Sequence, residues 1–138
     1  MIAHSEWQDG NTFRGISEEG NTVLFDGDAG HRHGPSPMQA VLMALCACTS
    51  VDVVSILQKK RQGLTGLRVT AEAEQAAQPP RVFTRIHLRY AVRGTLSRKA
   101  VEDAVALSKN KYCSVSKMLE KAAAIDYEIS YPDGEPEP

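Results

Sequence analysis

A long helix with clear start and stop signals is the feature of this sequence that most restricts its fold, and we expect it over residues 37–61. At its start, Ser36 can act as the N-cap, Pro37 occupies the first helical position, and Gln39 follows three residues after the serine, which together form a capping box. At its end, three consecutive basic residues complement the helix dipole, and Gly63 follows. The first half of the helix is almost entirely apolar, so we expect it to be buried on all sides.

Strands and two shorter helices are predicted around this helix. Alternating or apolar runs bounded by turn residues predict strands over residues 2–7, 12–17, 22–26, 67–73, 82–94 and 124–131. In the two runs that follow the long helix, apolar and polar residues alternate, which is typical of antiparallel strands with one face in water. An amphipathic helix capped by Ser97 is expected over residues 97–109, and a short helix is expected after Cys113.

The length and composition of the chain fit one globular domain. The chain has 138 residues, of which 42% are hydrophobic and 24% are charged. We therefore expect a single α+β domain over residues 1–138, with a polar, proline-bearing tail at 132–138 that frays. The net charge of −1 provides no electrostatic footprint for a nucleic acid or an anionic membrane, so neither is an expected partner.

The sequence gives no sign of export or of membrane insertion. Its first residues lack the basic and apolar regions of a signal peptide. Polar residues interrupt the apolar stretch of the long helix, which we therefore expect to be too short and too polar to span a bilayer; they are Thr49, Ser50, Asp52 and Ser55. Three cysteines without a Cys-x-x-Cys pair argue against a disulfide framework and against a structural zinc site. The cytoplasm is the expected compartment.

The three cysteines are the candidate reactive groups. Cys46 and Cys48 are two residues apart on the predicted helix, which separates them by about 200° of rotation. They can neither chelate one metal ion nor form a disulfide with each other, so at most one serves a given site, and both could be small core residues. Cys113 lies at or just before a helix that Ser114 or Ser116 can cap. The N–H groups and dipole there favour a thiolate, although a cysteine can also precede a helix by chance.

Two further patterns have a functional and an ordinary interpretation. His31 and His33 alternate in a glycine-containing loop, which would suit a metal ion or an anion, but no third ligand is evident and a solvated loop is the alternative. Arg85, Arg89 and Arg93 share one face of a predicted strand. We interpret them as a solvated face with ion pairs, the alternative being a surface for an anion or a protein partner.

Two segments together resemble the OsmC/Ohr family, the osmotically induced and organic hydroperoxide resistance proteins. The first is "GPSPMQAVLMALCACTSVDVVSIL", residues 34–57, and the second is "KYCSVSKML" with "IDYEISY", within residues 111–131. The order of the predicted elements agrees with that of the family over nearly the whole chain. The residues of the first segment are most similar to the family's YhfA-like branch. The resemblance implies an OsmC/Ohr-like fold, with antiparallel sheets packed around the long central helix in an intertwined homodimer.

The resemblance also assigns residues. The family's reactive cysteine falls on Cys48, its second cysteine on Cys113, and its active-site arginine on Arg14 of "GNTFRG". The peroxidase branches carry a glutamate near the start of the central helix that orients the arginine. At the matching positions this chain has Met38 and Gln39, which carry no charge.

The activity that the resemblance implies is the reduction of organic hydroperoxides by a cysteine. Cys48 would attack the peroxide and become a sulfenic acid, Cys113 would condense with it to a disulfide, and a dithiol of the lipoyl type would reduce the disulfide. Arg14 would hold the Cys48 thiolate, and no cofactor or metal is implied. The alternative is a non-catalytic module of the same fold that binds an apolar or thiol-containing ligand next to Cys48. A structural protein that uses the arginine face is a third interpretation.

Overall fold

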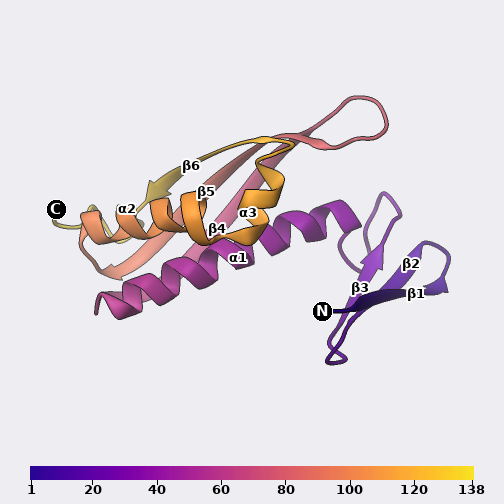
Figure 1. Cartoon of the computed structure of the whole chain (residues 1–138), viewed down its shortest axis with the longest axis horizontal. Coiled ribbons are helices and arrows are strands. Elements are labelled where there is room, and N and C mark those ends of the chain that lie inside the picture. Colours follow the sequence, from indigo (N-terminus) through magenta and orange to yellow (C-terminus); the bar gives the residue numbers. More distant parts are fainter. The chain divides into compact units, whose positions relative to one another are not determined.

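The computed structural model describes residues 1–138, and the chain forms two compact units, Met1–Met43 and Ala44–Pro138 (Figure 1). Helix α1, Pro37–Lys59, begins in the first unit and continues through the second. The predicted strands and helices are all present, so the α+β class is confirmed. Whether the two units fold together as one domain stays a prediction, and each is described here by itself.

The first unit is an antiparallel sheet with the order β1-β2-β3. Its strands are β1 Ala3–Asp9, β2 Thr12–Ser17 and β3 Thr22–Asp26. Gly15 lies opposite Val23 in the register, and a side chain there would place its Cβ 2.6 Å from the ring of Phe25. The glycine therefore leaves room for the aromatic ring of Phe25 against the middle strand.

A buried carboxylate orders the loop that joins β3 to α1. Asp26 is 1% exposed, and it accepts hydrogen bonds from the backbone N–H groups of Asp28, at 2.9 Å, and His33, at 3.2 Å. The Asp28 N–H in particular lowers the pKa of this carboxyl group. The Nδ1 of His31 lies 3.0 Å from the Asp26 backbone oxygen. The loop is therefore built around Asp26, and no group of three or more His, Cys, Asp or Glu side chains in the chain is arranged to hold a metal ion.

The second unit contains a sheet with the order β4-β5-β6, covered on one face by helices (Figure 1). Its elements after α1 are β4 Gly63–Gln75, β5 Phe83–Thr95, α2 Arg98–Leu107, the π-helical segment η1 Ser108–Tyr112, α3 Ser114–Leu119 and β6 Ala124–Ser130. Strands β4 and β5 are antiparallel as predicted, but β5 and β6 are parallel, so the expectation of purely antiparallel sheets is wrong. The reason is topological, because the helical segments between β5 and β6 form a crossover connection.

The two faces of β5 differ as the alternating pattern predicts. One face is buried and consists of Ile86, Leu88, Tyr90 and Val92. On the other face, Arg85 pairs with Asp126 at 3.2 Å, Arg89 with Glu72 at 2.8 Å, and Arg93 with Asp133 at 2.7 Å. All of these charged side chains are exposed, so the interpretation as a solvated face with ion pairs is confirmed.

The capping box of α1 is confirmed, and its C-terminus differs from the prediction. The Gln39 N–H donates to Ser36 Oγ at 3.0 Å, and the Ser36 N–H donates to Gln39 Oε1 at 2.9 Å. The helix ends at Lys59, and Arg61 adopts the left-handed conformation with φ 54°. The Gln62 N–H then bonds the carbonyl of Leu57 at 2.9 Å, as in a Schellman motif. An arginine therefore occupies the position that usually favours glycine, and Gly63 already belongs to β4.

Only one stripe of α1 is buried within the chain. It consists of every fourth residue: Leu45, Thr49, Val53 and Leu57. Met43 is 57% exposed, so the expectation that the first half of the helix is buried on all sides is not met by one chain. The helix has 23 residues and contains an 18-residue window with a mean hydropathy of 2.2, which by length and composition alone is enough to cross a membrane; the expectation that it is too short and too polar is wrong on that test. Its buried stripe is that of a helix packed on a protein core.

The C-terminal tail is attached more tightly than its composition predicts. The Arg98 N–H donates to the carbonyl of Glu137 at 2.8 Å, and Ser97 forms a parallel bridge with the same residue. The Arg98 side chain also pairs with Glu135 at 2.6 Å. These contacts connect the last residues to the start of α2.

Candidate thiol site

The second unit brings together two of the predicted site residues, Cys48 and Cys113. Cys48 is half-buried on α1, and Cys113 is fully buried between η1 and α3. Cys48 is near enough to Cys113 to raise the pKa of its thiol, and both thiols are free. The fold therefore places side by side two cysteines that are far apart in the sequence.

Cys113 is the N-cap of α3, and its own sulfur makes the capping contact. The Ser116 N–H donates to Cys113 Sγ over 3.4 Å, so neither the Ser114 nor the Ser116 hydroxyl caps the helix as expected. Burial raises the pKa of the Cys113 thiol to about 11, the Ser116 N–H acts in the opposite direction, and Cys48 and Asp52 add to the rise. The prediction that the helix N-terminus favours a Cys113 thiolate is therefore wrong, because desolvation of the anion outweighs the helix end. Cys113 is a protonated thiol at neutral pH.

Cys46 faces a different element. Burial raises the pKa of its thiol, and a backbone hydrogen bond from Ala71 of β4 acts in the opposite direction. Cys46 thus borders strand β4, whereas Cys48 borders Cys113. This arrangement confirms the geometric prediction that the two cysteines of the Cys-Ala-Cys sequence do not act as a pair.

A buried chain of hydroxyl groups lies next to the thiol pair. Thr49 Oγ1 is 2.7 Å from the hydroxyl of Tyr90 on β5 and 2.8 Å from Ser108 Oγ on η1. Ser108 Oγ in turn donates to Asp52 Oδ2 over 2.8 Å. The three hydroxyl-bearing residues are 0% exposed. Burial raises the pKa of Tyr90 to about 12, with the Thr49 hydrogen bond acting against the rise.

Sequence reasoning did not assign this chain of hydroxyl groups. Thr49 and Asp52 were visible only as polar interruptions of an apolar helix, which is a weak signal for buried hydrogen bonds. Tyr90 and Ser108 are 41 and 59 residues from Thr49, and nothing local in the sequence indicates the contact.

The π-helical segment η1 connects this chain of hydroxyl groups to Cys113. Ser108 is its first residue, and the carbonyl of Ser108 accepts the backbone N–H of Cys113 at 2.8 Å. Ser108 therefore contacts α1 through its side chain and Cys113 through its backbone. Short π-helical insertions of this kind occur frequently at functional sites.

The remaining predicted site residues belong to the first unit. Arg14 is exposed on β2, and Met38 and Gln39 are exposed in the first turn of α1. The side chain of Gln39 is engaged in the capping box. The placement of these three residues next to Cys48 stays a prediction.

A cavity opens beside Asp52. It has a volume of about 590 Å³, and its lining combines apolar side chains with Asp52 and two lysines. The apolar lining comes from Val51 and Ile56 of α1, Leu107 of α2, and Tyr112 of η1. Asp52 lies one helical turn after Cys48, so this cavity lies along the segment of α1 that carries Cys48.

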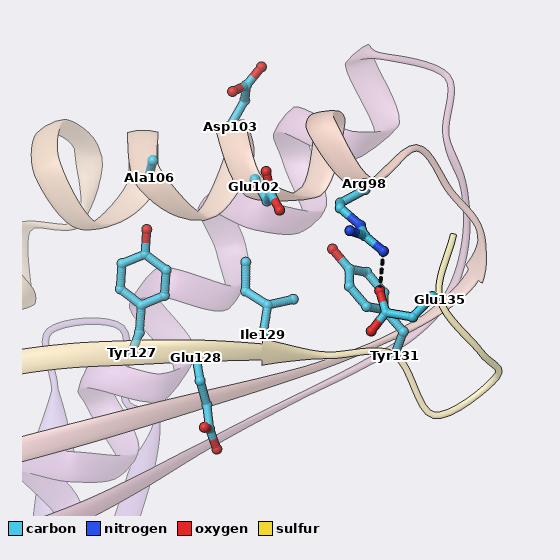
Figure 2. Close-up of a pocket in the computed structure, with 9 residues that line it drawn as sticks. All are labelled: Arg98, Glu102, Asp103, Ala106, Tyr127, Glu128, Ile129, Tyr131 and Glu135. Atoms are coloured by element: carbon cyan, nitrogen blue, oxygen red, sulfur yellow. Dashed lines mark hydrogen bonds and ion pairs between the residues drawn. The ribbon is translucent and has the colours of Figure 1, made fainter. Parts of the chain in front are cut away.

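A second cavity, of about 610 Å³, lies between α2 and β6 (Figure 2). Figure 2 shows Tyr127 and Ile129 of β6 pointing toward α2, and the ion pair of Arg98 with Glu135 closing one end. Its lining is mostly charged and contains no cysteine. This cavity is therefore not part of the thiol site.

Comparison with known proteins identifies the family. Residues 28–128 match the family described as OsmC-like protein. Protein YhfA of Escherichia coli (strain K12) is 47% identical over 132 residues, which cover 94% of this chain and 98% of that protein.

Solved structures show the same fold. The OsmC like protein from Mycoplasma pneumoniae has a TM-score of 0.81 at 15% identity, covering 94% of this chain and 95% of that one. The organic hydroperoxide resistance protein OhrB of Bacillus subtilis has a TM-score of 0.65 at 16% identity, covering 94% and 98%. The resemblance noted in the sequence is confirmed, and the chain belongs to the OsmC-like family.

Proposed function

We propose that this protein is a thiol-dependent peroxidase that reduces organic hydroperoxides in the cytoplasm, as part of oxidative stress defence. Its family and the hydroperoxide resistance proteins among its structural neighbours indicate a redox or peroxide-related role. The observation that carries the finer proposal is the proximity of the half-buried Cys48 to the buried, protonated thiol of Cys113. A substrate can reach the Cys48 thiol, whereas the Cys113 thiol is buried and would react only in the second step.

The reaction has two steps in the protein and one outside it. The Cys48 thiolate attacks the distal peroxide oxygen, the O–O bond breaks, and the departing alkoxide takes a proton to become an alcohol. The Cys113 thiol then attacks the sulfur of the Cys48 sulfenic acid, which forms the disulfide and releases water. A dithiol of the lipoyl type supplies two electrons and two protons to restore both thiols, and no resident cofactor is needed.

Arg14 is the proposed source of positive charge for the thiolate. An ordinary cysteine with a pKa of about 8.5 is only ~3% ionised at pH 7, and a pKa of about 6 would make ~90% available, a difference of about 3.4 kcal/mol. A guanidinium beside Cys48 would provide this stabilisation and would also neutralise the developing alkoxide. Met38 and Gln39 would take the place of the glutamate that orients this arginine in the peroxidase branches.

We further propose that the protein works as an intertwined homodimer. Much of α1 and its surroundings is apolar and uncovered within one chain: Val51 is 68% exposed, Met118 65%, Met43 57% and Tyr112 50%. Soluble monomers rarely leave so many large apolar side chains together in water. A mass in solution of twice 15.1 kDa is expected, and a monomeric mass at micromolar concentration would count against the dimer.

Peroxide turnover tests the central proposal. Reduced protein is mixed with cumene hydroperoxide or with hydrogen peroxide, and the Cys48–Cys113 disulfide is followed by mass spectrometry. We expect faster oxidation by the organic peroxide, loss of peroxide consumption in Cys48→Ser, and arrest at the sulfenic acid in Cys113→Ser. Cys46→Ser is the matched control and should behave like the parent. If Cys48→Ser consumes peroxide as fast as the parent, the proposal fails.

A non-catalytic module that binds an apolar or thiol-containing ligand next to Cys48 is the second candidate. The cavity beside Asp52, with its apolar lining, favours it, as do the uncharged residues Met38 and Gln39. The pH dependence of Cys48 alkylation separates the two candidates. A rate that has reached its plateau by pH 7 supports catalysis, and a rate that still rises through pH 9 supports binding.

A further inference from the structure

The hydroxyl chain beside the thiol pair has only one proton arrangement that satisfies every group. The ionised carboxylate of Asp52 can only accept, so the proton of Ser108 is directed toward it. The contact between Ser108 and Thr49 must then use the Thr49 proton, and the contact between Thr49 and Tyr90 must use the Tyr90 proton. The hydrogen bonds therefore run in one direction, from Tyr90 through Thr49 and Ser108 to Asp52, and such aligned bonds strengthen one another.

Ser108 is the point where this chain meets the second cysteine. Its side chain bonds to two residues of α1, Thr49 at 2.8 Å and Asp52 at 2.8 Å. Its backbone carbonyl holds the N–H of Cys113 at 2.8 Å. Thr49 is the residue next to Cys48 in the chain. One buried serine therefore connects the segment that carries Cys48 to the segment that carries Cys113.

Disulfide formation requires the segments that carry Cys48 and Cys113 to lie close together. A disulfide requires the two Cα atoms to lie about 4.4–6.8 Å apart with their Cβ atoms directed at each other. To bond with Cys48, the Cys113 sulfur must leave its capping contact with the Ser116 N–H, while its backbone stays close to α1. The Ser108 hydroxyl makes the hydrogen bonds that join η1 to α1.

From this geometry we infer that Ser108 is a positioning residue for the formation of the Cys48–Cys113 disulfide, and that it acts through its hydrogen bonds to Thr49 and Asp52. The inference deepens the proposed function, because it concerns the second step of that reaction. It does not involve the peroxide itself.

A thiol exchange reaction measures this step without peroxide. In a Cys46→Ser background, Ellman's reagent converts the half-exposed Cys48 to a mixed disulfide and releases one equivalent of thionitrobenzoate. Attack by Cys113 on the Cys48 sulfur then releases the second equivalent and forms the protein disulfide. The rate of the second release is the rate of ring closure.

Two matched variants bracket the effect. In Ser108→Ala we expect the second release to slow by about ten- to a hundredfold, because small misplacements of reacting groups have effects of this size. Ser116→Ala is the control, since Ser116 is as deeply buried, lies close to Cys113, and has a hydroxyl without a partner. Its backbone N–H, which makes the cap, is retained. This variant should close within about twofold of the parent.

Asp52→Asn separates positioning from charge. The asparagine oxygen can still accept the Ser108 hydrogen bond, while the loss of the carboxylate removes one of the groups that raise the pKa of Cys113. Ring closure in this variant should be as fast as in the parent or faster. If Ser108 contributed only to general stability, ring closure would be slower in both Asp52→Asn and Ser108→Ala.

Thr49→Val provides a second test from the α1 side. It removes the same link with little change in shape, so it should also slow ring closure, even if Ser108→Ala does not fold. The inference is overturned if a folded Ser108→Ala or Thr49→Val closes at the rate of Ser116→Ala, or if Asp52→Asn slows closure as much as Ser108→Ala. A protein that fails to consume cumene hydroperoxide but shows the expected closure rates would refute the proposed function and leave this inference standing.

Discussion

The second unit contains two sets of polar contacts with nearly the same distances and very different surroundings. The ion pairs on the open face of β5 span 2.7 to 3.2 Å between exposed side chains. The hydroxyl chain on the opposite face spans 2.7 to 2.8 Å; its three hydroxyl groups are fully buried, and only Asp52 at its end is part-buried. Water competes for the first set and salt screens it, whereas a broken bond in the second leaves buried polar groups without partners. Distance alone therefore does not indicate which contacts stabilise the fold.

Removing the central member of the buried chain should have the largest effect. Thr49→Val leaves the Tyr90 proton without an acceptor and deprives Ser108 of its donor. We expect the free energy of unfolding to fall by roughly 2 to 4 kcal/mol, as two buried groups lose their partners. Urea denaturation measures the change. A loss below about 0.5 kcal/mol would show that the two sets of contacts are equivalent.

The buried thiol should make stability depend on alkaline pH. Its pKa is raised to about 11 in the folded protein, so the unfolded chain releases this proton at a lower pH than the folded one. Stability should therefore be unaffected below about pH 8 and decline as the pH rises from about 9 to 11, by up to roughly 2 to 3 kcal/mol. Denaturation at a series of pH values tests this, with Cys113→Ala as the control that should remove the first part of the decline. Tyr90 adds a decline of the same sign at higher pH.

Removing an exposed ion pair should change the free energy of unfolding much less. Arg89→Gln removes the pair with Glu72 and should change the free energy of unfolding by no more than about 1 kcal/mol. The difference from the parent should shrink further in 0.5 M NaCl, because salt screens exposed charges. A loss as large as that of Thr49→Val would contradict the contrast drawn between the two faces.

The smallest effect is expected from His87 on the same open face. The hydrogen bond to Asp126, with help from Glu128, raises the pKa of His87. The stability that this pair provides is present below the ordinary histidine pKa of about 6.5 and is lost as the pH rises through the raised value. His87→Gln should remove this pH dependence of the free energy of unfolding, and only between the ordinary and the raised pKa of histidine. NMR titration of the ring measures the shift directly, and a pKa at or below 6.5 would exclude the effect.

The sequence predicted the elements that depend on local patterns. The capping box at Ser36 and Gln39, the alternation along β5, and the opposite orientation of Cys46 and Cys48 all follow from periodicity or helix geometry, and the structure has them. The parallel pairing of β6 was missed, because strand direction is set by the crossover and not by the strand's own residues. The left-handed Arg61 was missed because the pattern offered Gly63 two residues later.

The candidate site was predicted only in part, because burial and long-range contacts are not visible in local sequence patterns. Family resemblance located Cys48 and Cys113, and the fold brings them together. The acidity of Cys113 was predicted with the wrong sign, since sequence shows the helix start but not the burial that outweighs it. The role of Ser108 depends on contacts with residues 56 and 59 positions away, which no local pattern reports.

The N-terminal cap of α3 should depend on the redox state of the protein. The acceptor of the Ser116 N–H is the very sulfur that the proposed reaction converts to a disulfide. When that sulfur bonds to Cys48 it turns away from the helix, and α3, a helix of six residues, loses its only side-chain cap. We therefore expect oxidation to loosen this short helix. A partner that contacts the exposed side chain of Met118 on α3 would then distinguish the oxidised from the reduced protein.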